Sequence, residues 1–480
     1  MDKSKNLICN IYVVLIFGLL GIYYEYSYSN IIEAKSNCAL FLSIMITVFY
    51  VFLANKKDIR NHLLRKSNNY LLIILLSLSL TLFFSHYKIQ SLNGFSGWRV
   101  GTIQILLQLS VYFILSSGFR LYKYTVPLCM VFSIIILFIA VLNSFDIDVL
   151  SMHHGMSETG KYNYISTIGN SNTFSGYLSM IYSFCLGIFL FCKRKITFFL
   201  SVASLVLGNI CIFVCNCDSF WVSCFFVSFP ILIYVIKQRN IIAKVIIAAL
   251  LFCFTSIVLY SFRYILYEDR MERLTGITAL FFNIKLSIIL TLILTVLFVI
   301  KLKTSLFDKI SNRNAFIALF SIYAVIIAAV VCYSIIKFDN SWGTYRGFIW
   351  RKTCEMFKNL SLSEKIFGIG TDCFGIRFNE LYGTEIMKIF GVPVLNAHNE
   401  FLQYLITNGI FGLIIYICIY IRCLFNFFTV VDMTTATRTA YLPVCSYIGQ
   451  AFFNNPNMFN YAILCVFVSY VRLPPNKPNS

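Results

Sequence analysis

Charged residues are scarce in this sequence. Only 12% of its 480 residues are Asp, Glu, Lys or Arg, whereas 59% are hydrophobic and the mean hydropathy is +0.78. A typical soluble domain is about 25% charged and about 45–50% apolar. The composition therefore excludes an ordinary soluble fold and indicates a protein that is solvated by lipid.

Patterned cysteines and metal ligands are also missing. The 17 cysteines lie mostly in apolar runs, where cysteine behaves as a small hydrophobic residue, and no even, spaced set falls in one polar loop. The five histidines form no cluster with other metal ligands. We therefore expect no disulfide framework and no metal site.

Long apolar runs take the place of these features. A helix that spans a bilayer needs about 17–25 apolar residues, and backbone groups in hydrocarbon must bond within that helix. We therefore predict an all-α integral membrane protein, a polytopic bundle of about 12–14 transmembrane helices. The runs are approximately 7–24, 38–54, 70–86, 101–119, 125–145, 173–192, 196–216, 219–236, 241–262, 277–300, 315–336, 400–420, 438–453 and 457–471, of which 438–453 is the weakest.

The net charge of +19 is distributed unevenly. If the N-terminus is cytoplasmic and the chain crosses at each run, the inner segments hold 23 basic and four acidic residues, whereas the outer segments hold 16 of each. An excess of positive charge on the cytoplasmic side is the usual orientation signal. We therefore expect a multi-pass protein with both termini in the cytoplasm, and no nucleic acid as a partner.

The largest outer segment runs from 337 to 399. Within it, G-F-I-W-R-K-T-C-E-M-F-K-N-L places Trp350, Cys354 and Phe357 on one stripe and charged residues on much of the other side. This pattern predicts a helix that lies on the membrane surface or over the bundle. Because no internal repeat is present, we expect a single polytopic membrane domain, 1–480, with this segment as a large extracytoplasmic loop.

The loop ends at V-L-N-A-H-N-E-F-L-Q, which leads into an apolar helix. Asn399 is a natural N-cap for that helix. His398 precedes it at the positive end of the helix, which favours anions. From position alone, a histidine here is more often a capping or interfacial residue than a catalytic one.

Four arginines in the outer loops change that balance. Arg346 and Arg351 belong to the same loop as His398, and Arg270 and Arg273 belong to another. Arginines bind phosphates bidentately, and a histidine beside them can take or donate a proton. The alternative for each arginine is ordinary pairing with a nearby carboxylate, namely Glu268, Asp269, Glu272 or Glu355.

Glycines and asparagines mark two further turns. Gly169, Asn170 and Asn172 stand at an outer helix entrance, and Gly368 and Gly370 punctuate a turn-rich stretch within the large loop. The simplest interpretation of the first turn is a capped helix start, with Gly169 relieving backbone strain.

Four blocks resemble the O-antigen ligase and polymerase superfamily. G-N-S-N-T-F-S-G-Y at 169–177 resembles its G-N-P-N-x-x-A-G-x stretch, and T-Y-R-G-F-I-W at 344–350 resembles its R-x-x-I-W segment. F-G-I-G-T-D-C-F at 367–374 is similar to its G-x-G-x-x-F turn, and A-H-N-E-F-L-Q-Y-L-I-T-N-G-I-F-G at 397–412 is similar to its H-N-x-x-L…G-x-x-G stretch. The blocks occur in family order and give an O-antigen ligase-like region of residues 160–415.

The resemblance implies a GT-C-like glycosyltransferase on the outer face of the bacterial cytoplasmic membrane. Such an enzyme takes a glycan from a polyprenyl-diphosphate carrier and transfers it to a hydroxyl of a glycan, lipid or protein acceptor, without a metal, nucleotide sugar or other cofactor. Arg346 would then contact the diphosphate, and His398 would act as general base or orient the acceptor. Cationic clamps can stabilise such a leaving group without a metal.

One part of the sequence departs from the family pattern. Members often carry a Ser-Arg pair after the G-N-x-N block, but here Ser219 is followed by Phe220. If a second diphosphate-binding arginine is required, Arg270, Arg273 and Arg351 are the candidates.

Polymerase and ligase are not separated by these residues, since both use the same donor. Only nine residues follow the last apolar run, so we expect no soluble acceptor-recognition domain at that end. The alternative class is a lipid-linked oligosaccharide flippase, which should carry its polar groups near the midplane of the bundle. Here the runs are nearly free of charge, which favours the transferase. An inert scaffold would leave the four ordered blocks as coincidence.

Overall fold

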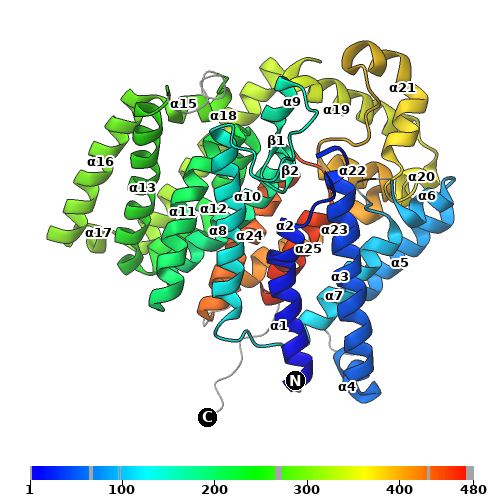
Figure 1. Cartoon of the computed structure of the whole chain (residues 1–480), viewed down its shortest axis with the longest axis horizontal. Coiled ribbons are helices and arrows are strands. Elements are labelled where there is room, and N and C mark those ends of the chain that lie inside the picture. The colour runs from blue at the N-terminus through cyan, green and yellow to red at the C-terminus, as the bar shows by residue number, and fades with distance from the viewer. Residues whose placement is uncertain are drawn as a thin grey trace. The chain divides into compact units, whose positions relative to one another are not determined.

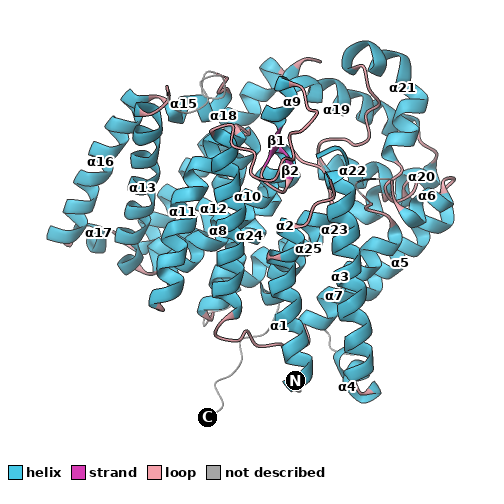
Figure 2. Ribbon diagram, in the orientation of Figure 1, coloured by secondary structure: helices cyan, strands magenta, loops and turns pink. Residues whose placement is uncertain are grey.

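The structure is a computed structural model that describes residues 3–26, 28–63, 69–95, 97, 99–264, 273–429 and 433–471. Almost every described element is a helix, and the described strands form one two-stranded antiparallel ladder in which Tyr164 pairs with Asn170 (Figures 1 and 2). The prediction of an all-α membrane protein is confirmed.

The backbone divides into two compact units. Unit 1 comprises residues 1–132, 340–444 and 451–480, and unit 2 comprises residues 133–339 and 445–450. Unit 1 contains α1 (Lys3–Phe17), α2 (Leu19–Ile22), η1 (Tyr28–Asn30), α3 (Ile31–Leu53), α4 (Lys56–Leu63), α5 (Asn69–Phe84), α6 (Lys88–Asn93), α7 (Thr102–Leu115), α19 (Trp342–Asn359), α20 (Leu362–Phe367), α21 (Phe374–Phe390), α22 (Glu400–Thr407), α23 (Gly409–Thr429), α25 (Met458–Val471) and most of α24 (Thr435–Ala451).

Unit 2 contains α9 (Glu158–Asn163), β1 (Tyr164–Ile165), β2 (Gly169–Asn170), α10 (Ser171–Phe191), α11 (Lys195–Cys215), α12 (Asp218–Lys237), η3 (Arg239–Ile241), α13 (Ile242–Ser261), α15 (Gly276–Phe282), α16 (Ile284–Lys303), α17 (Leu306–Lys309) and α18 (Asn312–Lys337). The helix α8 (Thr125–Ser144) begins in unit 1 and ends in unit 2.

The apolar runs form helices suited to a bilayer. Among the described residues, nine helical stretches are long and apolar enough to cross a membrane, and shorter apolar helices lie in α5, α7, α23 and α25. The weakest run, 438–453, forms α24, which contains Pro443 and is not one of these apolar helices. The chain is therefore a multi-pass helical membrane protein.

The predicted run 400–420 is not one helix. It forms the short α22 and then α23, because the chain turns at Gly409, where φ is 69°. A Cβ on Gly409 would lie 2.3 Å from the carbonyl oxygen of Ile366. The packing of α20 against this turn therefore requires glycine and breaks the helix.

The large loop contains three helices, α19, α20 and α21, where the sequence predicted one. The prediction of a turn-rich stretch missed α20, whose Ser361 and Glu364 form a capping box, and α21 was not anticipated. In α19 the buried stripe is shifted by one residue from the predicted one: Ile349 and Met356 are buried, whereas Cys354 is exposed.

The core of this region joins α19 to α22. Phe348, Ile349, Phe374, Phe378 and Ile406 pack in one buried cluster. Within unit 1, α19 and α21 lie at the opposite end from the N-terminus and α4 (Figure 1). The segment that carries His398 is thus held on a packed platform at one end of the unit.

Candidate functional site

The loop before α22, which we call the H-N loop (Asn396–Asn399), is fixed by side chains. The indole Nε1 of Trp350 donates to the carbonyl oxygen of Ala397 at 3.0 Å, and the amide N–H of Ala397 donates to Gln403 Oε1 at 2.9 Å. The N–H of His398 donates to Asn396 Oδ1 at 3.3 Å. Bonds from α19 and α22 therefore set the loop's conformation.

Asn399 is the N-cap of α22, as the sequence predicts. Its Oδ1 accepts from the N–H of Leu402 at 3.0 Å, and its Nδ2 donates to the carbonyl oxygen of Phe452 at 3.1 Å. The same side chain thus caps the helix and holds the segment that precedes α25. The capping interpretation accounts for Asn399 but leaves His398 unexplained.

His398 is strained and poorly solvated. Its φ is 49°, in the left-handed region that a non-glycine residue rarely adopts, and its Nδ1 is buried without a hydrogen-bond partner in the described structure. Burial, and second the charge of Arg346, lower the pKa of His398 to about 4. The ring is therefore neutral at pH 7 and has a nitrogen available to accept a proton.

Arg346 begins the regular part of α19. Gly343, Thr344 and Tyr345 before it have φ values of 60°, 58° and 64°, so the chain makes a left-handed kink that ends at the arginine. Its half-buried charge is close enough to lower the pKa of His398. The structure thus brings together two residues that are 52 positions apart in the sequence.

Arg351 lies on an exposed face of α19. Its guanidinium Nη1 donates to Asn340 Oδ1 at 2.7 Å. Glu355, its expected partner in the alternative interpretation, pairs instead with Lys352 at 3.4 Å.

The G-x-G turn supports the C-terminal end of α22. The N–H of Ile369 donates to the carbonyl oxygen of Ile406 at 3.0 Å, and the N–H of Gly370 donates to that of Thr407 at 3.1 Å. At Gly368, where φ is 84°, a Cβ would lie 2.2 Å from the Thr407 oxygen. The glycines that the sequence singled out therefore allow two backbones to approach closely, and they position α22.

Glu400 is a buried acid that the sequence analysis missed. It is 1% exposed, and its Oε2 accepts from the hydroxyls of Tyr416 and Tyr461, the latter at 3.3 Å. The available signal was a carboxylate directly before an apolar span, which is costly unless it is paired. It anchors the first turn of α22 to α23 and α25.

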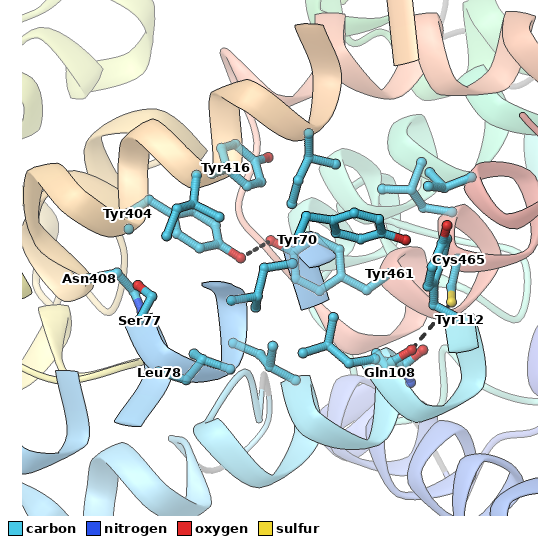
Figure 3. A pocket seen from close by; sticks show the side chains of 18 of the residues that line it. Tyr70, Ser77, Leu78, Gln108, Tyr112, Tyr404, Asn408, Tyr416, Tyr461 and Cys465 are labelled. Atoms are coloured by element: carbon cyan, nitrogen blue, oxygen red, sulfur yellow. Dashed lines mark hydrogen bonds between the residues drawn. The ribbon is translucent and has the colours of Figure 1, made fainter. Parts of the chain in front are cut away.

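Below this network lies a cavity of about 190 Å³ (Figure 3). Most of its lining is aliphatic or aromatic and comes from α5, α7, α22, α23 and α25. Tyr404 and Tyr461, whose hydroxyls are 3.2 Å apart, stand in its wall. The lining also includes Gln108, whose Oε1 is buried with no partner in the described part of the chain. The cavity suits a hydrocarbon ligand.

The remaining predicted residues belong to unit 2. Gly169 has a φ of 108° at the end of the small ladder, and Asn170 caps α10 by accepting from the N–H of Asn172 at 2.8 Å. The guanidinium of Arg273 stacks over the ring of Tyr162 at 4.6 Å. The capped-turn interpretation of this segment is therefore confirmed, while Arg270 lies outside the described residues.

Ser219, at the place where the family often has Ser-Arg, starts α12. Its hydroxyl is 3.1 Å from that of Ser175, and the backbone N–H of Ile277 donates to the adjacent Asp218 Oδ1 at 3.0 Å. This helix entrance contributes a carboxylate and hydroxyls where the family pattern would supply an arginine.

A comparison with known families matches one part of the chain. The O-antigen ligase family model matches residues 274–417. That range contains Arg346, the G-x-G turn and the H-N loop, whereas the G-N-S-N block lies outside it. No curated protein matches the chain. Residues 274–417 of this polytopic membrane protein are therefore similar to the O-antigen ligase family.

Proposed function

We propose that the protein transfers a glycan from a polyprenyl-diphosphate carrier to an acceptor hydroxyl in surface-polysaccharide biosynthesis, as a polymerase or ligase. The observation that carries this proposal is the buried, neutral His398 beside the half-buried Arg346. A neutral base next to a fixed cation suits a reaction in which a hydroxyl loses a proton and a phosphate leaves.

In the proposed reaction, His398 accepts the proton of the acceptor hydroxyl while its oxygen bonds to the anomeric carbon. The bond from that carbon to the carrier's diphosphate breaks, and the electron pair leaves with the diphosphate. Arg346 stabilises the developing negative charge. The fixed H-N loop holds the base in place, so that catalysis rests on positioning and electrostatics.

The cavity supports a lipid-linked donor. Its largely apolar lining, to which α23 and α25 contribute, suits the hydrocarbon chain of the carrier. The lipid would contribute membrane solubility and binding energy, while the diphosphate is recognised by arginine. Arg351, Arg273 and Arg270 remain the candidates for a second cation at the diphosphate.

We place the site on the outer face of the bacterial cytoplasmic membrane, with both termini in the cytoplasm. The basic inner segments support this orientation. So does the separation of α19 and α21 from the N-terminus and α4 at opposite ends of unit 1 (Figure 1).

The test compares His398→Ala and Arg346→Ala with wild type and a full deletion in the producing cells. We expect both variants to reach normal membrane levels, to lose polymer or ligated glycan, and to accumulate short units on their lipid carrier. His86→Ala and Arg313→Ala are the controls; His86 has a side chain that is 79% exposed. Full glycan transfer in either site variant would refute the assignment.

Two further readings of the same samples separate the activities. A loss of long chains with normal single-unit attachment indicates a polymerase, whereas intact long chains left on the lipid carrier indicate a ligase. A flippase would move lipid-linked glycan across the membrane of vesicles that contain no acceptor. Such movement, if His398→Ala leaves it unchanged, would favour a flippase and refute the transferase.

A further inference from the structure

The loop between α24 and α25 has an unusual composition. Residues 452–457 read F-F-N-N-P-N, and a further asparagine follows at 460. Asn457 caps α25 by accepting from the N–H of Asn460 at 2.8 Å. Helix capping explains the side chain of Asn457, but the side-chain oxygens of Asn455 and Asn460 have no bond in the described structure.

This loop is joined to the H-N loop. Asn399 Nδ2 donates to the carbonyl oxygen of Phe452 at 3.1 Å, and the rings of Phe401 and Phe452 are 4.6 Å apart. Because Asn399 directly follows His398, the F-F-N-N-P-N loop lies beside the base that we propose for the reaction.

Three aromatic rings bridge the same elements. Trp342 and Trp350 from α19 lie 5.3 Å apart, and each contacts Phe453, at 6.3 Å and 6.0 Å. All three side chains are half-buried. Trp350 also bonds to the H-N loop through Ala397. The rings and the H-N loop therefore form one continuous region of unit 1, and Asn455 and Asn460 follow Phe453 closely in the sequence.

Two amide oxygens in this region lack partners. Oδ1 of Asn455 and Oδ1 of Asn460 are buried with no hydrogen bond in the described structure, and Asn460 is only 2% exposed. Leaving a buried acceptor unpaired is unfavourable, and native proteins rarely do so without a ligand or water. The unpaired oxygens therefore need donors that the described part of the chain does not supply.

We propose that Trp342, Phe453, Asn455 and Asn460 form a subsite for a sugar ring of the glycan substrate. Amide side chains both accept from and donate to neighbouring hydroxyls, and aromatic rings cover the apolar face of a sugar. These four side chains carry no charge, so they suit a neutral polyol and not the diphosphate. The ring belongs to the acceptor or to the donor glycan, and the inference rests on the proposed transferase function.

A binding measurement tests the subsite without requiring turnover. The chain has four tryptophans, so the double variant Trp98→Phe, Trp221→Phe leaves only Trp342 and Trp350 as fluorophores. The full-length protein in nanodiscs is titrated with oligosaccharide fragments of the producing cell's own surface polysaccharide. We expect a saturable fluorescence change that persists with His398→Ala and whose midpoint rises by about 3- to 10-fold with Asn460→Leu.

Asn460→Leu is chosen because it separates binding from folding. Replacing an unpaired buried amide with an apolar side chain of similar size should raise the melting temperature, so that weaker sugar binding would not reflect unfolding. Asn359→Leu, at an exposed position of α19, is the matched control.

Initial rates with lipid-linked glycan extracted from the deletion strain identify which sugar is bound. Losing one hydrogen bond should raise one KM by about 3- to 10-fold with little change in kcat. A change in acceptor KM alone assigns the acceptor ring, and a change in donor KM alone assigns the donor ring. Trp342→Phe should retain the wild-type KM, whereas Trp342→Leu should not.

The two proposals fail differently. If His398→Ala abolishes transfer while Asn460→Leu and Trp342→Leu leave both KM values and the fluorescence titration unchanged, the subsite is refuted and the transferase stands. If His398→Ala retains transfer, the proposed function itself is refuted, whatever the tryptophans report.

Discussion

The fall of the transfer rate at acid pH, which is the acid limb of the pH–rate profile, tests directly whether the pKa of His398 is lowered. Burial and the neighbouring Arg346 lower the pKa of this histidine from 6.5 to about 4. At pH 6.5 an ordinary histidine is half protonated, whereas one with a pKa of about 4 is protonated in only about 0.3% of molecules. If His398 must be neutral to accept a proton, kcat/KM should stay constant down to about pH 5 and fall with an apparent pKa of about 4.

Substitutions of Arg346 separate its charge from its geometry. Arg346→Gln removes the second cause of the shift, so the acid limb should move upward but stay below 6.5, because burial is the larger cause. Arg346→Lys retains the positive charge and should retain the limb, although both variants lose rate, the Gln variant by about 10²- to 10³-fold. A bound anionic donor also offsets the charge of Arg346, so the limb in kcat should lie higher than the limb in kcat/KM.

The assay measures the initial transfer rate of the purified protein in vesicles from about pH 3.5 to about pH 8, a range that covers the titration of His398. A wild-type limb near 6.5 would show that His398 is solvated and contradict the geometry described above. Identical limbs in the Gln and Lys variants would show that the charge of Arg346 does not act on the histidine.

Three further substitutions test the framework around the site by thermal unfolding. Gly368→Ala should destabilise the protein by at least about 1–3 kcal/mol because of its positive φ and the contact with Thr407. The control Gly383→Ala has open space around it and should be neutral or stabilise the protein by about 0.5–1 kcal/mol. Equal effects of the two substitutions would contradict the close approach at Gly368. Asn399→Ala should cost about 0.5–2 kcal/mol by removing the N-cap, and an unchanged melting temperature would contradict the capping role. Because the pKa of His398 is lowered in the folded protein, the unfolded chain binds the proton more tightly. The free energy of unfolding should therefore be highest above about pH 6.5 and fall by up to about 3 kcal/mol towards pH 4. His398→Gln should reduce that loss, and an identical pH dependence in the variant would refute the lowered pKa of His398.

Local signals in the sequence predicted the helices and caps well. The spans follow from uninterrupted apolar runs, and Asn399 and Asn170 cap helices as their positions before those runs indicate. The break at Gly409 was missed because it depends on α20, a neighbouring segment whose approach has no signature within the run itself.

The site was only partly predictable. Arg346 and His398 were paired through a family resemblance, since no spacing rule connects residues separated by α20 and α21. Glu400 was overlooked because its burial depends on tyrosines of α23 and α25. The F-F-N-N-P-N loop lies where the apolar runs 438–453 and 457–471 meet, and its contact with Asn399 has no signature in the sequence.

The discontinuity of unit 1 has a consequence for biosynthesis. Residues 1–132 leave the ribosome first, but their partners from residue 340 onward follow only after about 200 residues of unit 2. At roughly 5–20 residues per second, the first helices wait about 10–40 s for residue 340 and longer for α22 and α25. In the folded protein Lys35 is 2% exposed, donates to the carbonyl groups of Leu20 and Gly21, and lies over the ring of Phe459, which is made only near the end of synthesis. Until the C-terminal helices are made, the early helices therefore lack part of the packing that surrounds Lys35 in the folded protein.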